Sequence, residues 1–306
     1  MTLHIRSRFL LNPLTIISAL SLFGILARGE NINIPQLQAR AAHGDADAEF
    51  ILGRAYDAGR GVPQDAGQAY AWYAKAAAQG SAKAENNLAS FYLNGTGVKQ
   101  DQAEAARWYV KAADQGSALA QFALGELYSR GEGVPADNNQ AAGWYRKAAE
   151  QGYLPAQVSL AQLKYFGAND LLADKTEAAK WIAKAAAQGN TWAQNTLGVS
   201  YEYGFGVQKD PKQAADWYRK AAEQGDAKAQ SNLGNLYAAG TGVEKSWPAA
   251  YAWLTLSASG GEITAQKLID SDEAWFTPAV VAAGKNLAGE YRRTIEKNKA
   301  SPAPGK

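Results

Sequence analysis

The sequence predicts an all-α protein, a right-handed α-solenoid of stacked helix hairpins, from three observations. Six tryptophans recur about every 36 residues, a period typical of helical repeat arrays. The small and apolar residues around each tryptophan follow the period of an α-helix. Glycines separate two helical stretches within each repeat. The tryptophans are Trp72, Trp108, Trp144, Trp181, Trp217 and Trp253.

Each repeat joins its two helical stretches through a glycine-rich turn. In the third repeat, Leu124 and Gly125 lie in the first stretch and Trp144 in the second. The Gly-x-Gly-Val turn lets the backbone reverse, and Asp137 is placed to cap the second helix. We expect the small residue at the position of Gly125 to leave a slot for the indole of the partner helix. That position holds Gly53, Ala89, Gly125, Ala161, Gly198 and Gly234.

Three motifs carry a family resemblance. Leu-Gly-x-x-Tyr, Gly-x-Gly-Val and Trp-Tyr-x-Lys-Ala-Ala-x-Gln-Gly are similar to the Sel-one-like repeat, a relative of the tetratricopeptide repeat, over residues 45–261. The resemblance implies six stacked hairpins and a non-catalytic protein that holds other proteins along a curved surface. Exported relatives with a cysteine pair in every repeat are linked to β-lactam binding and hydrolysis. This chain has no cysteine, so the resemblance does not imply that activity here.

The array is expected to have a cap at each end. One period before the first repeat, residues 30–44 predict a lone second helix with the polar Gln36 in place of tryptophan, which suits an N-terminal cap. Residues 262–298 predict C-terminal capping helices, the last one starting at Thr277 and Pro278. Residues 299–306, with two prolines and a glycine, predict a disordered tail.

Residues 1–29 have the pattern of a secretory signal peptide. Arg6 and Arg8 precede an apolar run at 14–27, and small residues follow it. An uncleaved membrane anchor is the alternative, but the run is about 14 residues, shorter than the ~20 of a spanning helix. The chain also lacks the cysteine that a bacterial lipoprotein signal requires. We therefore expect a soluble periplasmic or secreted protein without stable membrane insertion after signal cleavage.

The charge balance argues against nucleic acid as a partner. The chain has 31 Lys plus Arg and 29 Asp plus Glu. Cleavage after residue 29 would remove Arg6, Arg8 and Arg28 but no acidic residue, which leaves the mature protein close to neutral. Proteins that bind nucleic acid normally show a clear basic excess on one face. We expect other proteins or peptides of the envelope as partners.

The sequence displays no catalytic or metal-binding set, so we expect neither enzymatic activity nor a cofactor. Without cysteine, and with His43 as the one histidine after the predicted signal peptide, neither a His-containing zinc cluster nor a cysteine–histidine pair can form. The Gly-x-Gly turns follow helices and lack the third glycine of a dinucleotide-binding fingerprint. An aspartate recurs where second helices begin, a position typical of helix caps: Asp65, Asp101, Asp137, Asp174 and Asp210.

The fourth repeat departs from the pattern and predicts a candidate partner surface. Its loop has one inserted residue and no second glycine, while Lys164 and Ile182 replace the usual tyrosines. Five aromatic residues lie off the consensus positions near this break. They either refill the space left by the two substitutions or form a binding surface, since exposed aromatics supply much of the energy at interfaces. The five are Tyr165, Phe166, Trp192, Tyr203 and Phe205.

A second candidate surface is the face of the first helices opposite their core positions. In superhelical arrays this face commonly lines a concave groove that binds an extended peptide or a helix. Plain solvation is the alternative for any single residue. The residues expected there are Asn86, Ser90, Phe122, Glu126, Gln162, Asn195 and Asn235. On the second helices, a row of lysines is expected to be solvated, with stems that cover apolar surface: Lys75, Lys111, Lys147, Lys184 and Lys220.

These features together predict an exported, non-catalytic adaptor or scaffold of the cell envelope. Two other classes stay open. A periplasmic regulator of a membrane sensor or secretion system would differ from a scaffold by having one dedicated partner. An envelope hydrolase would need a convergent cluster with a perturbed acid in a deep pocket.

Overall fold

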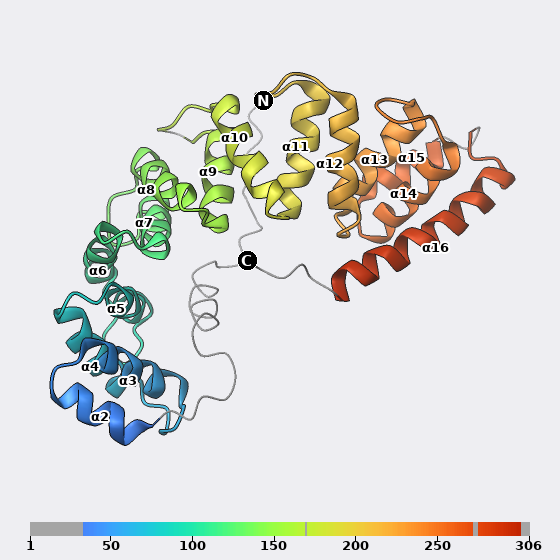
Figure 1. Ribbon diagram of the computed structural model, residues 1–306. Coiled ribbons are helices and arrows are strands. Elements are labelled where there is room, and N and C mark those ends of the chain that lie inside the picture. The colour runs from blue at the N-terminus through green and yellow to red at the C-terminus, as the bar shows by residue number, and fades with distance from the viewer. Residues whose placement is uncertain (1–32, 169, 272–274, 301–306) are drawn as a thin grey trace. The chain divides into compact units, whose positions relative to one another are not determined.

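The computed structural model describes residues 33–168, 170–271 and 275–300. This part of the chain contains fifteen α-helices and no strand, which confirms the predicted all-α solenoid of helix hairpins (Figure 1). None of the helices described there is long and apolar enough to span a membrane. The predicted signal peptide at 1–29 lies outside the described residues.

Twelve of the helices form six hairpins. The first helices are α3 (Ala46–Ala58), α5 (Ala82–Asn94), α7 (Ala118–Arg130), α9 (Leu154–Phe166), α11 (Thr191–Tyr203) and α13 (Ala227–Ala239). The second helices are α4 (Ala66–Ala78), α6 (Gln102–Asp114), α8 (Asn138–Glu150), α10 (Lys175–Ala187), α12 (Pro211–Ala222) and α14 (Trp247–Ser259). The flanking helices are α2 (Ile34–Ala42), α15 (Ile263–Ser271) and α16 (Pro278–Ala300). α16 therefore continues two residues beyond the expected end at 298.

The chain divides into two compact units, with the boundary between Tyr153 and Leu154. The N-terminal unit holds α2 to α8, and the C-terminal unit holds α9 to α16. Within each unit, a first helix packs on the second helix of its own hairpin, and that second helix packs on the first helix of the next. This alternation buries the apolar faces that a single hairpin would leave in water.

The residue after each tryptophan, rather than the tryptophan, fills the slot between the helices of a hairpin. Tyr145 is 3% exposed, and a Cβ on Gly125 would overlap its ring. Trp144 is only half-buried, so the expectation that the indole fills this slot is wrong. One step along an α-helix turns a side chain by about 100°, which points the two rings at different neighbours. The same close pairing joins Gly53 to Tyr73, Gly198 to Tyr218 and Gly234 to Leu254.

Helix caps and turns form where the sequence predicts them. Asp137 accepts a hydrogen bond from the Gln140 backbone nitrogen at 2.9 Å, and Gly131 ends α7 in the left-handed conformation with φ of 70°. A Cβ on Gly133 would overlap the Gln102 carbonyl of the preceding hairpin. The two glycines therefore serve different needs, chain reversal and close stacking. Matching N-caps are Asp65, Asp101, Asp174 and Asp210.

Buried glutamine side chains connect successive hairpins. In the third repeat, Gln151 Nε2 donates to Gln121 Oε1 at 2.8 Å, and Gln121 Nε2 donates to the carbonyl of Ala113 in the preceding hairpin at 3.1 Å. In the second repeat, Glu85 replaces this glutamine and accepts from Gln115 Nε2 at 2.8 Å. Burial raises the pKa of Glu85. An ionised Glu85 has no proton to donate to the preceding hairpin, so one stacking hydrogen bond is missing there.

Tyr145→Ala is expected to lower the free energy of unfolding by about 3 to 5 kcal/mol, because it empties a closely packed slot. Trp144→Ala should cost clearly less, since that indole is half-buried. Denaturant melts of both variants measure the difference, and Tyr145→Phe serves as the control that keeps the ring. Equal losses for the two alanine variants would contradict the assignment of the slot to tyrosine.

Glu85→Gln is expected to raise the free energy of unfolding at pH 7 by about 1 kcal/mol, the net value of one hydrogen bond. The raised folded pKa means that folding favours the protonated Glu85. Its contribution is full below the unfolded value near 4.5 and is lost as the pH rises through the folded pKa. The advantage of the glutamine should therefore shrink below pH 4.5 in melts at several pH values. Gln121→Glu, the reverse change, should destabilise at pH 7, and a pH-independent difference would contradict this account.

Candidate protein-binding surface

Four of the five off-consensus aromatics come together around Lys175 in the C-terminal unit. Tyr165 and Phe166, at the end of α9, form an edge-to-face pair with ring centroids 5.0 Å apart. Tyr203, at the end of α11, stacks on Phe205 with centroids 5.7 Å apart. The Lys175 Nζ connects the pairs, lying 4.5 Å from the Tyr165 ring centroid and 4.1 Å from that of Phe205. We call these five residues the aromatic–lysine cluster.

Three of the four rings of the cluster are exposed, whereas Tyr165 is half-buried. The exposed fractions of Phe166, Tyr203 and Phe205 are 70%, 59% and 36%. At the two substituted positions, Ile182 is fully buried and Lys164 Nζ lies 3.1 Å from a carboxylate oxygen of Glu177. The exposed rings are therefore available for a partner.

The backbone around the irregular fourth turn positions the cluster. Ala168 and Leu171 exchange two backbone hydrogen bonds of 2.7 and 3.1 Å, which close the loop before α10. In the next repeat, Gly206 approaches the Lys175 carbonyl so closely that a Cβ would overlap it. This contact holds Phe205, the preceding residue, near the start of α10. Residues from three separate segments thus meet at one end of the hairpins.

The cluster presents uncharged rings around one cation. The charge of the neighbouring Glu202 carboxylate raises the pKa of Tyr203, and burial raises that of Tyr165. Both phenols therefore stay protonated near neutral pH. Glu202 is held in place because it accepts a hydrogen bond of 2.6 Å from the Tyr218 hydroxyl in the hairpin slot. The surface combines apolar rings with the ammonium of Lys175, which suits an apolar segment that carries a carboxylate.

Trp192 lies apart from the cluster. It is the second residue of α11, whereas Tyr203 is the last, which separates them by about 16 Å at 1.5 Å per residue. Trp192 is half-buried, and its carbonyl accepts a hydrogen bond from Thr196 Oγ1 at 2.8 Å. The structure does not bring it to the other four aromatics.

Two residues expected on the open face of the first helices are buried. Phe122 is 3% exposed, with its ring centroid 5.8 Å from that of Tyr145 and 5.5 Å from that of Tyr153. Glu126 is 7% exposed, accepts a hydrogen bond of 2.7 Å from Tyr145 and pairs with Arg130. The expectation of an open face is wrong here, because the slot tyrosine and Tyr153, which follows α8, cover this part of α7.

Other residues of the first-helix face form hydrogen bonds between hairpins. Asn86 Nδ2 donates to Ser117 Oγ at 2.8 Å, and Asn195 Oδ1 accepts from Asn232 Nδ2 at 3.1 Å. These amides stabilise stacking and are partly withdrawn from solvent. The remaining expected residues are the half-buried Ser90 and the exposed Gln162 and Asn235.

Sequence reasoning missed Lys175 as a member of the surface. It is the first residue of α10, directly after the capping Asp174. The first turn of a helix favours negative charge, so a lysine there is an unusual choice. This unfavourable position of Lys175 could have marked it as a functional residue. Its contacts with the rings of Tyr165 and Phe205 explain why a lysine is found there.

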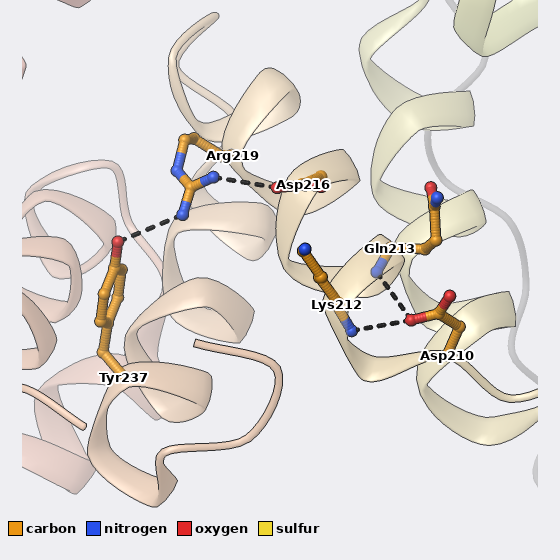
Figure 2. Close-up of polar contacts among 6 residues, drawn as sticks. All are labelled: Asp210, Lys212, Gln213, Asp216, Arg219 and Tyr237. Carbon is orange, nitrogen blue, oxygen red and sulfur yellow. Dashed lines mark hydrogen bonds and ion pairs between the residues drawn. The ribbon is translucent and has the colours of Figure 1, made fainter. Parts of the chain in front are cut away.

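A concave feature lies between α12, α13 and the loop that follows α13. Arg219 bridges Asp216 at 3.1 Å and the Tyr237 hydroxyl at 3.2 Å. Figure 2 shows these contacts and Asp210, which caps α12. The bridge ties the two helices together. The adjacent cavity of about 540 Å³ is lined by Arg219, Tyr237, Val243, Glu244, Lys245 and Ser246.

The carboxyl groups with raised pKa values take part in packing contacts. Burial raises the pKa of Asp57, which accepts a hydrogen bond of 3.3 Å from the slot residue Tyr73. Glu85 accepts from Gln115, as described above. Within residues 33–168, 170–271 and 275–300, no group of three or more histidines and carboxylates is placed to hold a metal ion. Hairpin packing therefore accounts for both shifted acids.

Comparison with solved structures finds similar proteins. A Sel1 repeat protein from Oxalobacter formigenes is 32% identical, and the alignment covers 80% of this chain and 99% of that one with a TM-score of 0.64. The protective antigen c5321 of uropathogenic Escherichia coli, which displays an SLR fold, is 28% identical over 88% of this chain and 74% of its own, with a TM-score of 0.40. No curated protein gives a significant match.

The family model for the Sel1 repeat matches six consecutive segments, 46–81, 82–117, 118–153, 154–190, 193–226 and 227–262. These segments coincide with the six hairpins of the structure. Sel1 repeat proteins mediate protein–protein interactions and are generally non-catalytic scaffolds. The chain belongs to the Sel1 repeat family.

Proposed function

We propose that the protein is an exported, non-catalytic adaptor of the cell envelope that binds a partner protein through the aromatic–lysine cluster. The observation that carries this proposal is the exposure of Phe166, Tyr203 and Phe205 around Lys175. Large aromatic side chains held by rigid elements are the residues that most often dominate binding energy. Membership of a protein-binding repeat family supports the same role.

The chemistry of the cluster defines the partner segment. Stacked rings offer apolar contact area with few rotatable bonds, so little side-chain entropy is lost on binding. The ammonium of Lys175 can pair with a carboxylate while it stays against Tyr165 and Phe205. The partner segment is therefore apolar and carries at least one acidic residue.

Export is the second part of the proposal, and the N-terminal sequence supports it. Basic residues, an apolar run and small residues follow one another in residues 1–29, in the order of a signal peptide. The absence of cysteine from the chain is compatible with an oxidising compartment, where free thiols would be a liability.

Tyr203→Ala combined with Phe205→Ala is expected to weaken partner binding by at least ~2 kcal/mol, the value typical of hot-spot residues. The melting temperature should change little, because both rings are exposed. The partner is first captured by photo-crosslinking from Phe166→p-benzoylphenylalanine in cells and then purified for titration calorimetry. Gln213→Ala, at an exposed residue of α12 outside the cluster, is the matched control and should bind as the wild type does. A binding loss that merely follows the unfolded fraction would overturn the proposed surface.

The mature chain is expected to begin between Arg28 and Glu30 and to fractionate with the soluble envelope extract. N-terminal sequencing of protein purified from that extract checks the cleavage point. Recovery of Met1 from the membrane fraction would show that the segment is retained as an anchor.

A further inference from the structure

The second helices carry a repeated pair that the aromatic–lysine cluster does not use. In each of the first five hairpins, a lysine lies three residues after the tryptophan and covers its ring. The distances from Nζ to the ring centroid are 4.1, 3.7, 3.8, 4.2 and 3.7 Å. All five lysines are exposed, whereas the indoles beneath them are half-buried or buried. The pairs are Trp72–Lys75, Trp108–Lys111, Trp144–Lys147, Trp181–Lys184 and Trp217–Lys220.

The sixth hairpin shows what happens when the lysine is absent. Leu256 stands at the lysine position, and α16 packs along α14 (Figure 1). Tyr291 of α16 stacks on Trp253 with centroids 4.3 Å apart and an interplanar angle of 11°. Trp253 is then 3% exposed. An aromatic ring of a docked helix thus takes the place that lysine holds over the other tryptophans.

The contacts around Tyr291 define the rest of this docking mode. Ala288 and Ile295 of α16, one turn before and after the tyrosine, lie in one buried cluster with Trp253 and Leu256. Further along, Asn298 Nδ2 donates to the carbonyl of Glu223 at the end of α12 at 3.1 Å. The docked helix therefore runs from α14 to the preceding second helix.

We propose that the tryptophan–lysine faces of the first five hairpins bind an amphipathic helix of a partner protein that carries a carboxylate one turn from an aromatic residue. The aromatic ring stacks on the indole as Tyr291 does on Trp253. This displaces the lysine from the ring and costs its cation–π contact. A carboxylate one turn away pairs with the displaced ammonium at the solvent-exposed edge of the docked helix.

The same reasoning argues against the α16 helix of a second copy of this chain as the helix that binds the tryptophan–lysine faces. Its residues one turn from Tyr291 are Ala288 and Ile295. These apolar side chains pack well with Leu256 but offer no hydrogen-bond acceptor to a lysine. Charge favours an acidic partner at α10 and α12 in particular. These helices carry the acidic residues Glu177 and Asp216 against Lys175, Lys180, Lys184, Lys212, Arg219 and Lys220.

The test uses synthetic peptides of residues 279–299 and the full chain. One peptide carries Ala288→Glu and Ile295→Glu, and the matched control carries glutamine at both positions. The glutamate peptide should bind about fivefold more tightly at low salt, as expected for exposed ion pairs, and fluorescence anisotropy measures the difference. With Tyr291→p-benzoylphenylalanine in the peptide, cross-links should map to the second helices beside the tryptophans.

Lys147→Leu in the full chain changes only the tryptophan–lysine face of α8. The faces of the other four hairpins stay unchanged and serve as internal controls. For the glutamate peptide, the cross-link to α8 should be lost while those to the other second helices remain. The unmodified peptide should gain a cross-link to α8, because leucine now stands where Leu256 stands in the sixth hairpin. Circular dichroism checks that the variant folds. Three outcomes would overturn the proposal: equal binding of the glutamate and glutamine peptides, cross-links to first helices, or tighter binding of the unmodified peptide to the wild type. None of them would bear on the aromatic–lysine cluster.

Discussion

The structure depends on the fit of one large side chain into a slot made by one small residue. In each hairpin, a tyrosine, isoleucine or leucine of the second helix is buried, and where its counterpart on the first helix is glycine the two are in close contact. At Gly125 there is no room for a Cβ beside Tyr145, so the two helices approach more closely than ordinary residues allow. Once each hairpin has this fixed geometry, the same stacking can repeat within each unit.

Stacking leaves few polar side chains free to contact a ligand or partner. Polar groups inside the array form hydrogen bonds within and between hairpins, as the glutamine side chains and the contact between Glu126 and Tyr145 show. The surfaces that remain exposed include the turns at the ends of the hairpins and one face of the second helices. The aromatic–lysine cluster occupies the first kind of surface, and the tryptophan–lysine pairs occupy the second. Both place a lysine against an aromatic ring, so we expect acidic partners at both surfaces.

The irregular fourth repeat shows how a local departure creates a distinct surface without disturbing the array. Lys164 and Ile182 replace two tyrosines, yet Ile182 is fully buried and Lys164 pairs with the carboxylate of Glu177. The core is therefore intact, and the aromatic residues beside the altered turn stay at the surface.

The sequence by itself determined the features that depend on neighbouring residues along the chain. The repeat length, the hairpins, the aspartate caps and the turn glycines follow from helical period and local backbone conformation, and the structure has them where the sequence places them. Only the tertiary structure decided that Tyr145 rather than Trp144 fills the slot, that Phe122 and Glu126 are buried, and that Lys175 meets rings from two other segments. Adjacent residues of one helix differ by about 100° in direction, so their burial depends on the placement of neighbouring helices, which no local pattern specifies.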